Sequence, residues 1–176
     1  MSLHDELLAT ARALVGGPHP SDADLRRGIS TAYYALFHRL IDAAVHHFLP
    51  THNPDQHAGF ARVFEHAKMR DVCRVVAQSA KQPNPNPSPP VGRILGYPIP
   101  AELKQVADAF GNLQKLRFDA DYNRVPPIST ITLAAAEDAI GKVESAFADW
   151  NLLETNHRGV ARAFLVLLLT GEPKGR

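Results

Sequence analysis

The stretch from Asp22 to Leu49 reads DADLRRGISTAYYALFHRLIDAAVHHFL and predicts one long helix. Ser21 precedes it, and Asp24 follows three residues later, which is the pattern of a helix-starting capping box. Pro50 ends it, because proline cannot donate a backbone hydrogen bond. Apolar residues recur at helical steps, at Ile29, Tyr33, Phe37, Leu40, Ala44 and Phe48. At about 1.5 Å per residue the helix is roughly 40 Å long, enough to form the spine of a helical bundle.

A second, polar stripe runs along the same predicted helix, through Arg27, Thr31, Tyr34, His38, Asp42 and His46. One interpretation is an ordinary solvated face. The other is the wall of a cleft to which Arg27, Tyr34 and His38 contribute. A metal site is not expected, since about 12 Å of helix separates His38 from His46, which is too far for one ion. We therefore predict neither a metal nor a cofactor.

Further helical segments are predicted on both sides of this spine. Asn53 is placed to cap the third helix, and Pro54 suits its first position. Because no segment alternates as a strand would, we predict an all-α, antiparallel up-and-down bundle of five or six helices. The other predicted helices cover about 3–15, 54–79 with a break near Met69, 101–116, a stretch capped by Ser129 or Thr130, and a last helix at about 156–170 capped by Asn156.

Residues 82–100 are rich in proline and read as neither a helix nor a central strand. Such a segment either separates two domains or forms a long surface loop. Neither side of it has enough helices for an obvious core of its own, so we expect a loop within one domain that covers residues 1–176.

Composition limits the class of protein. The chain has 176 residues, 45% of them hydrophobic, and a net charge of +1, which argues against a nucleic-acid binder that relies on a massively basic surface. Its one cysteine, Cys73, fits a reducing compartment. The first residues lack the apolar core of a signal peptide, and the longest apolar run, 163–169, is far too short to cross a bilayer. We expect a soluble, cytoplasmic protein.

Arg117 occupies an unusual position in the sequence. Leu103, Val106, Phe110 and Leu113 form an apolar stripe that, extended by four residues, reaches Arg117. An arginine directed into an apolar face needs an anionic partner, because an unpaired buried charge costs on the order of several kcal/mol. Two interpretations remain open, namely an ion pair with Asp119 or Asp121 and a phosphate contact beside the hydroxyl of Tyr122.

Three segments resemble motifs of the HEPN-domain family. Residues 30–38, Ser-Thr-Ala-Tyr-Tyr-Ala-Leu-Phe-His, resemble its Ser-x-Ala-Tyr-Tyr-Ala-x-Phe-His signature. Residues 57–60, His-Ala-Gly-Phe, resemble the start of the next helix in that family. Residues 116–122, Leu-Arg-Phe-Asp-Ala-Asp-Tyr, resemble its Leu-Arg-x-x-Ala-Asp-Tyr element. The three lie in the family's order within residues 21–150.

The resemblance implies an antiparallel helical bundle that is often a homodimer. Many HEPN proteins are metal-independent ribonucleases of toxin–antitoxin and defence systems, with an active motif of arginine, four to six residues, and histidine. This chain departs from the motif, because Tyr122 stands five positions after Arg117 and no histidine follows before His157. A tyrosine hydroxyl, with an ordinary pKa of about 10, is a poor base at neutral pH.

Two hypotheses follow for function. In the first, the chain is an RNA- or nucleotide-binding protein of toxin–antitoxin or defence type, and a weak ribonuclease. Arg117 would then hold phosphate, Tyr122 and Asp121 would orient it, and His38 would transfer a proton, with further binding contacts from Arg27, Tyr34 and Asp119. In the alternative, Arg117 is a structural ion pair. The chain is then a non-catalytic interaction module for a partner antitoxin or a nucleotidyltransferase-like protein, and whether it is an enzyme stays open at this point.

Overall fold

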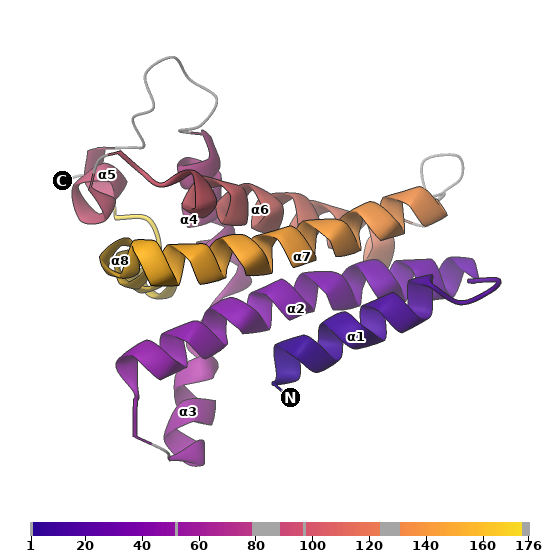
Figure 1. The fold of residues 1–176 in the computed structure, drawn as a ribbon, viewed down its shortest axis with the longest axis horizontal. Coiled ribbons are helices and arrows are strands. Elements are labelled where there is room, and N and C mark those ends of the chain that lie inside the picture. The colour runs from indigo at the N-terminus through magenta and orange to yellow at the C-terminus, as the bar shows by residue number, and fades with distance from the viewer. Residues whose placement is uncertain (1, 52, 79–88, 97, 124–130, 174–176) are drawn as a thin grey trace. The chain divides into compact units, whose positions relative to one another are not determined.

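The computed structural model describes residues 2–51, 53–78, 89–96, 98–123 and 131–173 (Figure 1). These residues form helices and no strand, which confirms the predicted all-α fold. Eight helices are present in the described part of the chain, against the five or six expected. They are α1 (Leu3–Val15), α2 (Asp22–Phe48), α3 (Pro54–Ala61), α4 (His66–Gln78), α5 (Pro89–Leu95), α6 (Ala101–Tyr122), α7 (Leu133–Asn156) and α8 (Arg158–Thr170).

The chain clusters into two compact units, each built from two separate segments. The first unit comprises residues 1–39 and 109–147, and the second comprises residues 40–108 and 148–176. The divisions between them fall inside α2, α6 and α7, and none falls in the proline-rich stretch. That stretch is therefore not the boundary between the units, and a single domain over residues 1–176 stays a prediction.

In the first unit, α1 and the beginning of α2 form an antiparallel helical hairpin (Figure 1). The two helices approach closely, because a Cβ atom at Gly28 would lie only 2.5 Å from Val15 Cγ2. Gly28 therefore permits a contact that any larger residue would obstruct. On the outside, the side chain of Arg12 donates from Nε to Glu144 Oε1 at 2.8 Å, which links α1 to α7. The fully buried residues of this unit include Ala11, Ile29, Tyr33, Leu36, Phe110 and Leu113.

The second unit has its own core. Trp150 is fully buried, and its ring lies 6.3 Å from that of Phe164 on α8. Helix α8 packs against both α4 and α5. At the end of α2, His47 Nε2 lies 3.3 Å from Glu154 Oε1 of α7. Other fully buried residues of this unit are Met69, Val72, Cys73, Val76, Leu103, Val106, Leu153 and Leu165.

Two of the predicted helix starts are confirmed by their hydrogen bonds. The Ser21 hydroxyl donates to Asp24 Oδ2 at 2.6 Å and accepts from the Asp24 backbone N–H, which is the expected capping box. Asn53 Oδ1 accepts from the backbone N–H groups of Asp55 and Gln56. The sequence therefore correctly predicted the N-cap residues of α2 and α3.

Several predicted boundaries are wrong. The helix expected over 54–79 is two helices, with the break between Ala61 and His66 instead of near Met69. Part of the proline-rich stretch is helical, because Pro89 and Pro90 occupy the first positions of α5, where a missing N–H costs nothing. Residues 82–88 of that stretch lie outside the described residues.

The C-terminal boundaries also differ. Helix α7 continues through Asn156, so His157 is the N-cap residue of α8, and its side chain makes no capping bond. Ser129 and Thr130 lie outside the described residues. At the start of α7, Thr132 Oγ1 accepts from the Ala135 backbone N–H at 3.1 Å. Within the described ranges, none of the helices combines the length and the apolar character that crossing a membrane requires.

Candidate functional site

Arg117 lies on a helix that extends further than its apolar stripe predicted. Helix α6 does not end at residue 116 but continues through Tyr122. Arg117 and Asp121 are therefore four residues apart on one helical face, whereas Tyr122 lies about 140° around the helix from Arg117. Residues 117–122, which lie beyond the predicted helix, form the last part of α6.

Asp121 is the centre of a small polar cluster in the first unit, which we call the Asp121 cluster and which consists of Ser30, Arg117 and Asp121. Asp121 Oδ2 lies 2.8 Å from Arg117 Nε, but the Nε–H is not directed at a hydrogen-bond acceptor, so the contact is an ion pair. The Ser30 hydroxyl of α2 donates to Asp121 Oδ1 at 2.5 Å. Each carboxylate oxygen of Asp121 is thus occupied by a different residue.

Two tyrosines of α2 border the Asp121 cluster. The Arg117 Cζ atom lies 5.3 Å from the centre of the Tyr34 ring and 5.9 Å from that of Tyr33. Both distances fall within the range of a cation–π interaction. Tyr33 is fully buried and packs on Phe110, with ring centres 5.6 Å apart. The side chain of Arg117 is only 21% exposed, so the prediction that Arg117 turns towards the protein interior is consistent with its surroundings.

Arg26 is a residue of this region that the sequence analysis missed. Its Nη1 donates to the backbone carbonyls of Ala120 and Asn123, at 2.9 and 3.0 Å, while its Nε donates to Asp22. Backbone carbonyls at the C-terminal end of a helix lack hydrogen-bond donors within the helix. The guanidinium of Arg26, on α2, donates to two such carbonyls at the end of α6. Its neighbour Arg27, named as a binding residue from the sequence, is exposed. The spacing of four residues from Asp22 to Arg26 was the sequence pattern that could have indicated an ordered Arg26 side chain.

The predicted site residues do not all converge. Arg117, Asp121 and Tyr34 are brought together. The ring of His38 lies 6.5 Å from that of Tyr34, so His38 and Arg117 both lie beside Tyr34. Asp119 is half-buried on α6.

Tyr122 is 64% exposed and packs on Phe118, which is 60% exposed, with ring centres 5.2 Å apart. We call these two residues the Phe118–Tyr122 pair. Lys115, three residues before Phe118, is exposed as well and shares this face of α6. An exposed aromatic pair beside a cation can contact a protein partner or stack on a base.

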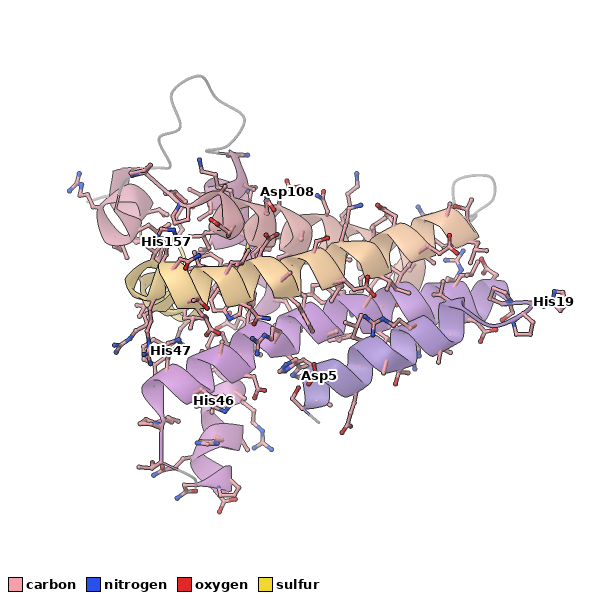
Figure 2. The ribbon with its side chains drawn as sticks, viewed as in Figure 1. Asp5, His19, His46, His47, Asp108 and His157 are labelled. Carbon is pink, nitrogen blue, oxygen red and sulfur yellow. The ribbon has the colours of Figure 1, made fainter. Side chains whose placement is uncertain are left out.

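The histidines of α2 are not arranged as a metal site. His46 Nδ1 lies 2.7 Å from the backbone oxygen of Asp42, so this ring turns back on its own helix near the end of α2 (Figure 2). Among the residues that the structure describes, no group of three or more His, Cys, Asp or Glu side chains is placed to hold a metal ion.

The fold and the site define an all-α protein in which one unit holds a partly buried ionic cluster, with an exposed aromatic pair on the same helix. No protein-family model matches the chain, and no curated protein or solved structure matches it either. Its function is therefore argued from its own residues.

Proposed function

We propose that this chain is a non-catalytic, HEPN-like helical binding module. The observation that carries this proposal is the occupation of Asp121, whose two carboxylate oxygens are engaged by Arg117 and by Ser30. An arginine already paired with a carboxylate has its charge neutralised locally. A phosphate brought to Arg117 would also approach the negative charge of Asp121, which disfavours its binding.

The position of Tyr122 supports the same proposal. A metal-free ribonuclease needs a phosphate-binding group and proton-transfer groups that act on the same phosphodiester. Tyr122 lies about 140° around α6 from Arg117 and packs on Phe118. The two residues that would replace the Arg–His motif of the family are therefore directed to different sides of one helix.

The Phe118–Tyr122 pair is the proposed contact surface. Exposed aromatic side chains supply much of the free energy at protein interfaces, and here they stand on a helix anchored by the Asp121 cluster. The partner would be a protein with an apolar recess for two rings. The HEPN resemblance suggests an antitoxin or a nucleotidyltransferase-like protein, and a homodimer also remains part of this proposal.

RNA or nucleotide binding without cleavage is the second candidate. It is favoured by the exposure of Lys115 next to two aromatic rings, since single-stranded nucleic acids bind by base stacking together with phosphate contacts to cations. In this case the same Phe118–Tyr122 pair would stack on bases, so the two candidates share a surface and differ in the ligand.

The test combines a cleavage assay with a binding assay on the full chain. Labelled RNA in EDTA should stay intact, and cleavage that disappears in Arg117→Ala would refute the non-catalytic proposal. The chain would also be co-expressed with the product of the neighbouring gene. The double variant Phe118→Ser/Tyr122→Ser should lose co-purification, whereas Leu133→Ser, which changes another exposed apolar residue of the same unit, should retain it.

A further inference from the structure

A second charged surface lies in the other unit, on α8. Arg158, Arg162 and Val166 follow each other at steps of four residues, and all three are exposed. Residues at this spacing share one face of a helix, and we call this one the α8 arginine face. Helix α8 contains no acidic residue at all. Its two charges are therefore not neutralised within the helix.

The two helices that pack on α8, α4 and α5, also carry more basic than acidic residues. Helices α4, α5 and α8 together carry six basic residues, Lys68, Arg70, Arg74, Arg93, Arg158 and Arg162, against one acidic residue, Asp71. The whole chain has a net charge of only +1, so positive charge is concentrated on these three helices.

Local ion pairs account for only part of this charge. Lys68 pairs with Glu65, and Arg70 pairs with Asp71. The four remaining arginines, Arg74, Arg93, Arg158 and Arg162, are exposed and form no ion pair with any residue that the structure describes. Their charges remain available to an external anion.

The position of the arginines within α8 strengthens this argument. Arg158 is the first residue of α8 and Arg162 follows one turn later, with no acidic residue in the first turn and no capping bond from the His157 side chain. The helix dipole already places positive potential at this end, so the guanidinium of Arg158, in the first turn, lies in an unfavourable field. A negatively charged partner would remove this unfavourable arrangement.

We propose that the α8 arginine face docks an acidic segment of a partner protein that also carries aliphatic side chains. The inference rests on the proposed function as a binding module and names the chemistry of a partner. Arginine suits carboxylates because its planar guanidinium can pair with both oxygens. Val166, on the same face, is an exposed aliphatic residue that would contact the apolar part of such a segment. Helix α5, which packs on α8, also exposes an aliphatic residue beside an arginine, Ile94 next to Arg93.

The same residues favour a peptide over RNA. Single-stranded nucleic acids are usually bound by exposed aromatic rings together with cations. The exposed Phe and Tyr side chains in the described part of the chain are Phe118 and Tyr122 of the first unit, and α4, α5 and α8 expose none. Cations interspersed with aliphatic groups match an acidic, aliphatic peptide better than a phosphodiester chain.

The experiment measures binding of two labelled probes to the full chain by fluorescence anisotropy. One is a short peptide of glutamate, leucine and valine, and the other is a short oligouridine. The double variant Arg158→Ala/Arg162→Ala should weaken peptide binding by about fivefold to tenfold, the size expected for two exposed ion pairs. Raising the salt concentration from about 50 to about 300 mM should weaken it too. Arg62→Ala removes an exposed arginine elsewhere in the unit and should leave binding unchanged.

The outcomes separate this inference from the proposed function. If the peptide does not bind, or binds the double alanine variant as well as the unchanged chain, the inference is overturned. It is also overturned if the oligouridine alone binds and depends on the two arginines. If Arg158→Lys/Arg162→Lys still binds the peptide, the positive charge of these two residues accounts for the binding, which supports the inference. Circular dichroism of each variant checks that it folds. RNA cleavage in EDTA would refute the proposed function without affecting the peptide result.

Discussion

Arg117 and Asp121 lie one helical turn apart near the end of α6, with Arg117 Nε 2.8 Å from Asp121 Oδ2. Their side chains are 21% and 27% exposed, so water only partly screens the pair. Asp121 is also held by Ser30 from α2, ninety-one positions away in the sequence. An ion pair within one helix thus becomes a tertiary contact, because the same carboxylate connects α6 to α2.

Replacement of Arg117 tests the structural role of this contact. Arg117→Ala leaves the Asp121 carboxylate without its cation and removes the interaction with the tyrosine rings. We expect the free energy of unfolding to fall by about 1–3 kcal/mol, measured by urea denaturation. Arg70→Ala is the matched control, since Arg70 also pairs with an aspartate but is 54% exposed. Its stability should change by less than about 0.5 kcal/mol. Equal effects of the two variants would contradict the structural role.

Ser30 provides a separate test of the link between helices. Ser30→Ala removes the donor to Asp121 Oδ1 in a nearly buried place, so we expect a loss of about 1–2 kcal/mol in the free energy of unfolding. Thr10→Ala removes a hydroxyl that bonds only to the backbone of its own helix at an exposed position, and should be nearly neutral. A neutral Ser30→Ala would show that the link contributes nothing to stability.

Stability should depend on pH through the capping box of α2. The hydrogen bond from the Ser21 side chain lowers the pKa of Asp24 below its ordinary value of 3.8, with a smaller contribution from the Ser21 backbone. A lowered pKa in the folded state adds stability above the unfolded pKa, and this is lost as the pH falls through the folded pKa. The stability difference between the unchanged chain and Ser21→Ala should therefore shrink below about pH 4. Urea denaturation at neutral and acidic pH measures it, and a constant difference would refute the assignment.

Asp149, in the second unit, has a pKa that is shifted in the opposite direction to that of Asp24. Burial, followed by the charge of Glu102, raises the pKa of Asp149 above its ordinary value. A raised pKa means that the folded state loses stability as the pH rises through it. Asp149→Asn should consequently be more stable than the unchanged chain at neutral pH. This gain should disappear at acidic pH, where Asp149 is protonated, and a gain that persists there would contradict the assigned cause.

Local sequence patterns predicted most of the helical content. The capping patterns at Ser21 and Asn53 were correct because each depends on residues within three positions of the cap. The predicted boundaries failed where local patterns gave more than one answer. Asn156 resembled a cap but continues α7, and Pro89 resembled a helix breaker but begins α5. The ends of a helix depend on which of its terminal backbone N–H and C=O groups find partners in neighbouring elements. A short window of sequence does not contain that information.

The candidate site was predicted less completely than the helices. The apolar periodicity of residues 103–113 correctly indicated that Arg117 would turn inward and need an anionic partner. Arg27 was chosen in place of Arg26, and Tyr122 was grouped with Arg117 although it is directed elsewhere. Helix α6 continues beyond residue 116, so the sequence did not show which carbonyls Arg26 would meet or on which side of a helix Tyr122 would lie.

The sequence by itself determined that the chain forms helices, where α1, α2, α3 and α6 begin, and that an arginine would occupy an apolar face. These properties depend on backbone hydrogen bonds and side-chain spacing within a few residues. Only the tertiary structure decided that Asp121 and Ser30 would meet, and that Arg26 would bind the end of α6. Those contacts join residues more than ninety positions apart, and their formation depends on how whole helices pack within the first unit.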